Sequence, residues 1–438
     1  MTDVGLLFLV MSPIVGIEID SDFFTTMSQT DAIQQINVDI IIIGGGIAGL
    51  WLLNRLRSQG YNAILFEQNR LGSGQTIASQ GMIHGGIKYT LDGVFTNISE
   101  TIADMPNRWK ACLAGQGEVD LSHAKIFSDH VYLWSGTSLG AKVTTFFASR
   151  ALRGRVSAVA KSDYPTVFQD NAFNGKLYRL QEIVVDVPSV VSALVKNYQT
   201  AIFKIDWQQA KWVQTHKGRV EALQINHNGK PLAIQSQCFV FAAGEGNEKL
   251  LQQLSITQPE MQCRPLHQVL VKHDYPHPLY AHCIGTGTNP TPRLTVSSHA
   301  TPDGSFIWYL GGDIATKGVE KTESELIATA KQELKELFSW IDFTQAQWGS
   351  LHINRAEPKQ RHFMLPEKAY VKQCDTAENV IVAWPIKLTL SPSLASEVLE
   401  LLRKLRINPK YHGLNLLTTL PRPEIAQPFW EPIFSSQT

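Results

Sequence analysis

Runs of apolar residues alternate with amphipathic stretches along this chain, a pattern typical of α/β proteins. The first run, residues 38–43, is almost unbroken and predicts a parallel strand that is buried on both faces. A helix is expected to follow and to end near Gln59, because Gly60 is a natural C-cap. Residues 63–66 predict a second parallel strand, so these segments form a strand–helix–strand unit.

The rest of the chain predicts helices and a large group of strands. The predicted helices lie near residues 92–115, 138–152, 188–198, 323–340 and 392–405. The segment 263–312 is rich in strands, and Asn228-Gly229 predicts a hairpin turn. We therefore predict a disordered extension (1–36), a discontinuous nucleotide-binding domain (37–90, 185–260 and 370–405), a substrate domain (91–184 and 261–369) and an extended tail (406–438).

The turn after the first strand has the composition of a dinucleotide cradle. Its residues are Gly44, Gly45, Gly46, Ile47, Ala48 and Gly49. Gly44 permits the tight turn, Gly46 lets the backbone approach a diphosphate, and Gly49 lets the helix pack against the strand. The N-terminus of that helix offers N–H groups and a partial positive charge to phosphate oxygens. Glu67, at the end of the second strand, is placed to accept hydrogen bonds from ribose hydroxyls.

Composition narrows the class of protein. The chain of 438 residues is 44% hydrophobic and 18% charged, as expected of a globular protein with a large core. Basic and acidic residues number 39 each, so no net charge favours nucleic acid or anionic membranes. Five widely spaced cysteines form no CxxC pair, which favours a reducing, cytoplasmic location. No segment reads as an integral membrane span.

Three segments resemble the FAD-dependent oxidoreductases of the D-amino-acid oxidase (DAO) family, which includes glycine oxidase, sarcosine oxidase and glycerol-3-phosphate dehydrogenase. They are the glycine turn with Glu67, residues 74–89 (GQTIASQGMIHGGIKY) and residues 239–251 (FVFAAGEGNEKLL). The end of the second segment is similar to a His-Gly-Gly-hydrophobic-basic-Tyr stretch of glycerol-3-phosphate dehydrogenases. The resemblance implies an α/β fold in which a Rossmann-like FAD-binding domain is interleaved with a strand-rich α+β substrate domain.

The resemblance implies FAD as the cofactor, and the single cradle, to which the chain returns after a long insertion, favours FAD over NAD(P). Besides the glycine turn, the expected contacts are Glu67, Gln68, Ala78, Ser79, Gln80, Gly81, Met82, Ala243, Gly244, Lys387 and Leu388. Lys387, with the N-terminus of the last strong helix, would stabilise an anionic reduced flavin. One feature departs from the family, because the segment 383–392 before that helix contains no glycine.

Four residues are candidates for catalysis: His84, Arg355, Tyr309 and His267. His84 is the first candidate for a base, because its loop is expected to pass the flavin ring and imidazole titrates near neutral pH. Arg355 could hold a carboxylate or phosphate with two hydrogen bonds. No metal site is predicted, because the histidines of the region match no zinc spacing. These histidines are His267, His273, His277, His282 and His299.

These observations predict an FAD-dependent oxidoreductase that oxidises a small C–N or C–O substrate by hydride transfer to the flavin. Amino acids, amines, hydroxy acids and polyol phosphates are the candidate substrates, and oxygen, a quinone or another carrier is the candidate electron acceptor. Neither a nucleic-acid partner nor a membrane segment is expected. Two alternatives remain at this point: an NAD(P)-dependent dehydrogenase, which would be colourless, and a non-catalytic flavin-binding protein, whose FAD no substrate would bleach.

Overall fold

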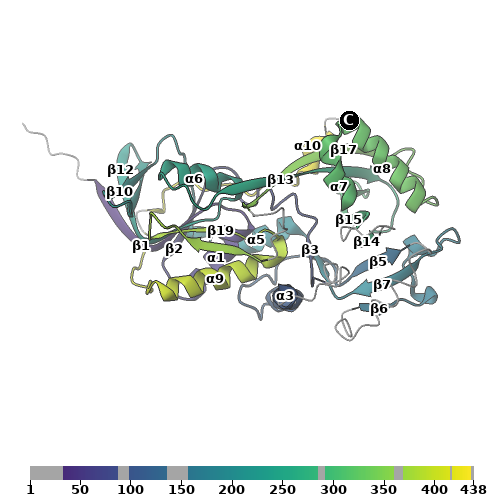
Figure 1. Ribbon diagram of the computed structural model, residues 1–438, viewed down its shortest axis with the longest axis horizontal. Helices are drawn as coiled ribbons and strands as arrows, with labels where there is room; N and C mark the ends of the chain where they lie inside the picture. Colours follow the sequence, from purple (N-terminus) through teal and green to yellow (C-terminus); the bar gives the residue numbers. More distant parts are fainter. Residues whose placement is uncertain are drawn as a thin grey trace, which may run out of the picture.

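The computed structural model describes residues 33–86, 98–135, 156–284, 292–359, 368–414 and 417–435. Within these residues the strands form two eight-stranded sheets and one three-stranded sheet. The two large sheets lie toward opposite ends of the long axis of the molecule, with β3 (Met82–Ile83) and α3 (Ile98–Leu113) between them (Figure 1).

The first sheet is built around a parallel core. Its strands are β1 (Gln34–Ile43), β2 (Ala63–Glu67), β9 (Ile202–Lys204), β10 (Lys211–Gln214), β11 (Val220–His227), β12 (Lys230–Phe241), β18 (Tyr370–Gln373) and β19 (Val380–Trp384). β1 pairs in parallel with β2 on one side and with β12 on the other. Every residue of β1 from Val38 onward is buried, which explains the unbroken apolar run in the sequence.

Helices cover both faces of this sheet. α1 (Ile47–Ser58), α5 (Val187–Asn197) and α9 (Ser391–Lys404) lie on one face, and α6 (Asn247–Gln253) lies on the other (Figure 1). Alternate residues of β1 serve the two faces, because Ile40 and Ile42 pack with α1 whereas Ile41 and Ile43 pack with Leu250 of α6 and its neighbours. The sheet is therefore enclosed as the sequence pattern predicts.

The second large sheet is mostly antiparallel. In spatial order its strands are β17 (Gln347–Pro358), β13 (Met261–His273), β16 (Phe306–Gly311), β15 (Leu294–Ala300), β14 (Ala281–Ile284), β5 (Val131–Ser135), β7 (Lys176–Leu180) and β6 (Val156–Ala158). α7 (Asp313–Lys317) and α8 (Glu323–Leu337) pack against it, and Thr322 and Glu325 form a capping box at the start of α8. The small sheet joins β3 to β8 (Ile183–Val185) and β4 (Ile126–Ser128).

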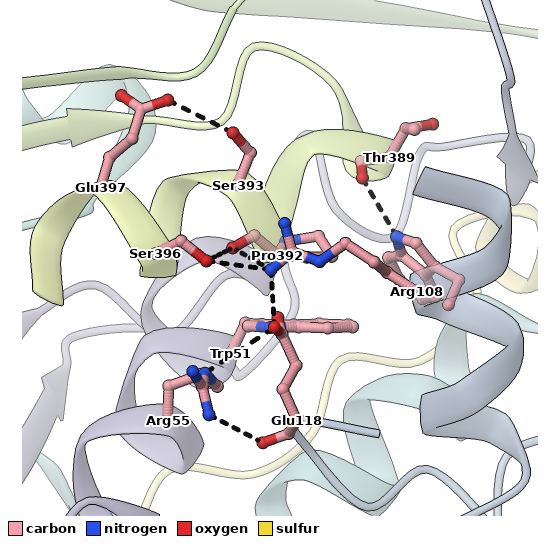
Figure 2. A network of polar contacts seen from close by, with 10 residues as sticks. Trp51, Arg55, Arg108, Glu118, Thr389, Pro392, Ser393, Ser396 and Glu397 are labelled. Atoms are coloured by element: carbon pink, nitrogen blue, oxygen red, sulfur yellow. Dashed lines mark hydrogen bonds and ion pairs between the residues drawn. The ribbon is translucent and has the colours of Figure 1, made fainter. Parts of the chain in front are cut away.

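A polar network fixes α3 against α1 and α9 (Figure 2). The Arg108 guanidinium donates to a Glu118 carboxylate oxygen at 2.6 Å, to the Pro392 carbonyl at 3.1 Å and to the Ser396 hydroxyl at 2.9 Å. The Trp51 indole N–H of α1 donates to the other Glu118 oxygen at 3.0 Å. The network therefore positions the start of α9, which follows directly on the segment expected to border the flavin.

Two predicted boundaries differ from the structure. Residues 34–36 were assigned to the extension, but they begin β1 and pair with residues 232–234 of β12. The tail is not extended to its end, because α10 (Trp430–Ser435) forms there and packs Phe434 against Leu270 and Ile307. Its apolar residues lie on one helical face, and this face is buried by packing against the second sheet.

Other predictions fall partly or wholly outside the described residues. The helix near 138–152, most of the extension and residues 87–89 of the family-like segment belong to this group. The Asn228-Gly229 hairpin is confirmed, because β11 and β12 pair across it and both residues have positive φ. The division into domains stays a prediction. Among the described helices, none is long and apolar enough to cross a lipid bilayer.

Candidate functional site

A cavity of about 1210 Å³ extends from the carboxyl ends of β1 and β2 to the second sheet. Its walls include Ile43 and Phe66 from the first sheet, and Arg264, Thr295 and Gly311 from the second. Ligand sites of α/β proteins commonly lie at the carboxyl ends of parallel strands and between domains. The cavity is therefore the candidate functional site.

Most of the residues selected from the sequence line this cavity. They are Gly44, Gly46, Ile47, Ala48, Glu67, Gln68, Ala78, Ser79, Gln80, Met82, His84, Ala243, Gly244, Arg355, Lys387 and Leu388. Gly45, Gly49, Gly81, His267 and Tyr309 lie nearby without lining it. The structure thus brings together side chains from segments that are far apart in the sequence.

The glycine turn leaves open space at the start of α1. Gly44 has φ of 113°, and a Cβ atom there would lie 2.6 Å from the Ala242 carbonyl oxygen. Gly46 differs, because its Cβ would meet only Thr76 Oγ1, at 3.1 Å. Gly46 itself provides no side-chain cap for α1, and of the N–H groups in its first turn that of Ile47 is bonded by Thr76 Oγ1 at 3.0 Å. Gly46, Ile47 and Ala48 line the cavity at this helix N-terminus, which is the kind of site that binds anions, so the turn fits the diphosphate of a dinucleotide.

The three glycines that do not line the cavity are required for packing. A Cβ atom on Gly49 would lie 1.9 Å from the Gly44 carbonyl oxygen, and one on Gly45 would lie 2.6 Å from Leu71 Cδ2. A Cβ atom on Gly81 would lie 2.1 Å from the Val185 carbonyl oxygen. The absence of a side chain at these three positions lets the backbone pack closely against its neighbours, and the cavity is lined by the adjoining residues.

Glu67 lies beside the turn, as expected of a ribose-binding acid. Its Oε2 accepts a hydrogen bond from the Gly45 N–H at 2.6 Å, and its Oε1 accepts one from the Asn69 N–H at 2.7 Å. Each carboxylate oxygen can accept a second hydrogen bond, so the group can still receive ribose hydroxyls. The contact with ribose itself stays a prediction.

The loop of residues 72–81 is held on both sides. Thr76 Oγ1 accepts a hydrogen bond from the Ile47 N–H of α1 at 3.0 Å. The Tyr309 hydroxyl of β16 donates to the Ala78 carbonyl and lies 2.7 Å from Gln268 Oε1. The Gln80 amide donates back to the Tyr309 carbonyl at 2.7 Å. The loop is therefore part of the wall, and Thr76, which the sequence analysis did not select, helps to fix it.

Tyr309→Phe is expected to lower the free energy of unfolding by about 1–3 kcal/mol, because the buried Ala78 carbonyl would lose its donor. Burial holds the pKa of the Tyr309 hydroxyl well above its usual value, so it remains a donor at neutral pH. Amide hydrogen exchange should become faster in residues 76–80. Tyr61→Phe is the control, since it removes a single bond to the Ile407 carbonyl elsewhere. Unchanged exchange rates in the 72–81 loop would show that the Tyr309 hydroxyl does not hold this loop in place.

His267 is a structural residue rather than a cavity residue. It is 1% exposed, its Nδ1 lies 3.1 Å from the Gly318 carbonyl oxygen, and its Nε2 lies 2.8 Å from Ser350 Oγ. Its ring stacks on His352 at 3.6 Å between centroids. His352 does line the cavity, and burial together with the neighbouring His267 lowers its pKa. Neither His267 nor Tyr309 is therefore among the residues that line the cavity.

His84 stands in a cluster that the sequence analysis did not recognise. Its Nδ1 lies 3.2 Å from Glu182 Oε2, and Glu182 Oε1 accepts a hydrogen bond from the Gly85 N–H at 2.9 Å. His282 lies beside them, with 5.8 Å between the two imidazole centroids, and its Nδ1 is 2.8 Å from Thr295 Oγ1. His84 and His282 both line the cavity. No local motif marks Glu182, because it lies 98 residues from His84.

The same cluster bears on the prediction of no metal. His84, Glu182 and His282 offer ligand atoms that lie within 4.8 Å of one another. Of the five histidines weighed in the sequence, only His282 belongs to this group. The spacing of residues along the chain could not reveal it, because the three come from separate strands and loops. The absence of a metal stays a prediction.

The glycine-free segment before α9 still makes a sharp turn. Ile386 has φ of 65°, a left-handed conformation that is rare for a β-branched residue. The Lys387 N–H donates to the Pro385 carbonyl at 2.7 Å across this turn. All three residues line the cavity. Ile386 therefore takes a conformation that glycine usually supplies, which accounts for the departure from the family pattern.

Arginines border the cavity on the second sheet. Arg264 of β13 forms a two-bond ion pair with Glu357, at 2.5 Å and 2.7 Å, and Glu357 is 1% exposed. The positive charge of Arg264 is thus matched within the wall. Arg355 of β17 also lines the cavity, and its Nε donates to the Arg264 carbonyl at 3.3 Å. Arg355 therefore lies in the cavity wall, and its role in binding a carboxylate or phosphate stays a prediction.

Comparisons with known proteins show which family the chain resembles. A family model described as FAD dependent oxidoreductase (DAO) matches residues 39–386. The FAD dependent oxidoreductase PA4991 from Pseudomonas aeruginosa is 45% identical over 411 residues, which cover 92% of this chain and 100% of that protein. Its crystal structure superposes with a TM-score of 0.79 and covers the same share of this chain and 99% of its own.

More distant solved structures share the fold. Glycine oxidase from Geobacillus kaustophilus has a TM-score of 0.59 at 15% identity and covers 86% of this chain and 100% of its own. L-α-glycerophosphate oxidase from Mycoplasma pneumoniae, with FAD bound, has a TM-score of 0.59 at 14% identity and covers 86% and 99%. The predicted α/β fold class is confirmed by these likenesses.

Proposed function

The chain belongs to the family of FAD-dependent oxidoreductases, and on that premise we propose that it oxidises a small molecule at a C–N or C–O bond inside the cavity between its two large sheets. Its cofactor is FAD. The observation that carries the proposal is one continuous cavity that includes the glycine turn, His84 and Arg355. The two alternatives raised from the sequence are set aside, because the family is one of FAD-dependent enzymes.

We propose that the adenosine diphosphate half of FAD binds along the glycine turn, with Glu67 at the ribose. The remaining proposed contacts are Gln68, Ala78, Ser79, Gln80, Met82, Ala243, Gly244, Lys387 and Leu388, all of which line the cavity. Bound FAD supplies the acceptor for a hydride from a substrate carbon. The cradle, the open space beside Gly46 and the acidic end of β2 support this arrangement.

Three residues are proposed to act around the reacting atoms. His84 accepts the proton that leaves the substrate nitrogen or oxygen, since an imidazole can take a proton near neutral pH. Arg355 binds an anionic group of the substrate. Lys387 provides a positive charge at the flavin end of the cavity, next to the start of α9. The support for these roles is that all three residues line one cavity.

The proposed substrate class follows from the side chains proposed to act in the cavity. A proton acceptor and an arginine suit small molecules that carry a carboxylate or phosphate beside an amine or hydroxyl. Of the two distant relatives, one is named for glycine, which is an amino acid, and the other for L-α-glycerophosphate, which is a polyol phosphate. Amino acids, hydroxy acids and polyol phosphates are therefore the first candidates, and amines without an anionic group are the second.

The test is a visible spectrum followed by an anaerobic screen. The purified protein is expected to carry the absorption of oxidised flavin, and a substrate should bleach it in the absence of air. Amino acids, amines, hydroxy acids and glycerol 3-phosphate make up the panel. Re-oxidation of the bleached enzyme by oxygen or by a quinone then identifies the class of electron acceptor. A flavin that every member of the panel leaves oxidised would contradict the proposed substrate class.

The organisation of the chain and its location are also proposed. We propose that residues 34–90, 185–260 and 370–405 form the FAD-binding domain, because they supply every strand of the first sheet. Residues 91–184 and 261–369 would form the substrate domain. A cytoplasmic location is supported by free cysteines at all five positions.

A further inference from the structure

We propose that Glu182 is a positioning residue that keeps the proton of His84 on Nδ1, so that Nε2 can receive the proton leaving the substrate. This inference deepens the proposed oxidation and rests on it, because it gives His84 its role as base. Glu182 belongs to the segment between β7 and β8, and its carboxylate contacts the ring of His84 and the N–H of Gly85.

Glu182 is held rigidly in the protein interior. The residue is 1% exposed, and both carboxylate oxygens are engaged: Oε1 by the Gly85 N–H at 2.9 Å and Oε2 by His84 at 3.2 Å. A buried carboxylate is costly unless such hydrogen bonds satisfy it. Since both bonds come from one dipeptide, His84-Gly85, the carboxylate is directed at the backbone and the ring of the same segment.

The contact determines which ring nitrogen carries the hydrogen. An ionised carboxylate can only accept hydrogen bonds, so the hydrogen between it and His84 belongs to Nδ1. The lone pair of the neutral imidazole is then on Nε2. A neighbouring carboxylate also favours the positively charged imidazolium that forms when Nε2 gains a proton.

The backbone of His84 is fixed from the opposite side. Its N–H donates to Thr389 Oγ1 at 3.1 Å, and the Thr389 carbonyl accepts the Trp109 indole N–H of α3 at 3.0 Å. Thr389 is 1% exposed. His84 is therefore clamped between Glu182 and the segment that leads into α9, which leaves its ring as part of the cavity wall.

The resulting step balances in atoms and charge. The substrate loses a hydride from carbon, which FAD accepts, and a proton from nitrogen or oxygen, which His84 accepts at Nε2. A C=N or C=O bond remains in the product. The imidazolium lies next to the Glu182 carboxylate, so the pair passes from one negative charge to none. Glu182 itself exchanges no proton with the substrate in this step and acts through His84.

A bound metal ion is the other reading of this cluster, because His282 brings a third ligand within 4.8 Å. One observation favours the hydrogen-bonded dyad. The His84 Nδ1–Glu182 Oε2 distance of 3.2 Å is that of an N–H···O hydrogen bond. The Nδ1 of His282 lies 2.8 Å from Thr295 Oγ1, so a metal ion would have to bind His282 through Nε2.

The tautomer can be measured in the holoenzyme without any substrate. Nitrogen-15 NMR of histidine-labelled protein, with the His84 signals assigned by their loss in His84→Gln, should show a proton on Nδ1 and none on Nε2. In Glu182→Gln, the amide NH₂ can donate to Nδ1, and the proton is expected to move to Nε2. A wild-type ring protonated on Nε2 would overturn the proposal, and the wild-type spectrum decides this even if the variant does not fold.

Kinetics supply the second readout once a substrate is known. In Glu182→Gln, the limiting rate of anaerobic flavin bleaching is expected to fall about 10²–10⁴-fold, with little change in the half-saturating substrate concentration. Glu397→Gln is the matched control, because Glu397 bonds Ser393 on α9 away from the cluster. An unchanged limiting rate would overturn the proposal. If no substrate bleaches the wild-type flavin, the proposed function fails while the NMR result still decides the tautomer.

Elemental analysis separates the dyad from a metal site. Purified wild-type holoenzyme is expected to contain no stoichiometric transition metal and to keep its activity after EDTA treatment. One metal ion per chain, absent from Glu182→Gln, would overturn the proposal in favour of a His84–Glu182–His282 centre.

Discussion

Gly46→Val is expected to weaken FAD binding by at least about 100-fold, so that the variant is purified without its yellow colour. The valine side chain would start 3.1 Å from Thr76 Oγ1 and extend into the space at the start of α1, where we propose that the diphosphate lies. The variant is expected to fold, because Gly46 has φ of −75°, which any residue can adopt.

The ratio of flavin to protein absorption measures this loss, and titration of the colourless protein with FAD gives the affinity. Circular dichroism and thermal unfolding of both proteins without FAD establish that the fold is retained. Ala158→Val is the control, since it adds methyl groups at an exposed position of β6. Stoichiometric FAD in the Gly46→Val protein would show that the diphosphate binds elsewhere.

His84→Gln is expected to lower the limiting rate of flavin bleaching by about 10²–10⁴-fold while FAD binding is retained. Glutamine has no group that accepts a proton near neutral pH, so the substrate nitrogen or oxygen would have to lose its proton to water. The measurement is anaerobic stopped-flow absorption with the substrate identified by the screen.

His216→Gln is the control for this variant, because His216 is exposed and remote from the lining of the cavity. Its bleaching rate should equal that of the wild type. A His84→Gln enzyme that bleaches at the wild-type rate would remove His84 from the reaction. The proposed role of Glu182 in positioning the proton of His84 would then fail as well.

The sequence predicts the first βαβ unit well because its determinants are local. The apolar run of β1, the glycines that follow and the acid at the end of β2 lie within one short stretch. Each has a separate physical requirement: burial on both faces for the strand, a positive φ at Gly44 and close packing at Gly49. The register of β1 against β12 joins segments about two hundred residues apart, and only the structure reveals it.

Two of the four predicted catalytic residues lie outside the cavity lining, because side-chain direction depends on the partner surface. On β13, Arg264, Leu266 and Gln268 line the cavity, whereas His267 lies on the opposite face of the strand. On β16, Tyr309 is directed toward the 72–81 loop, and its hydroxyl bonds the loop carbonyl of Ala78. Both residue types suggested a catalytic role, but the face of the strand determines whether a side chain reaches the cavity.

Glu182, Thr389 and His282 were missed for a different reason. Each lies beside His84 although it comes from a remote segment, as when His84 bonds Glu182 across 98 positions and Thr389 across 305. Nothing in their own sequence neighbourhood distinguishes them from ordinary polar residues. The helix α10 was missed in the same way, because its apolar face has meaning only against Leu270 and Ile307 of the second sheet.

A crystal structure of the yellow protein tests the proposed site most directly. The account predicts diphosphate oxygens within hydrogen-bond distance of the backbone N–H groups at the start of α1, beside Gly46. It also predicts the flavin ring at the end of the cavity that contains His84 and Lys387. Electron density for FAD anywhere else on the protein, or a ring separated from His84 by the second sheet, would contradict it.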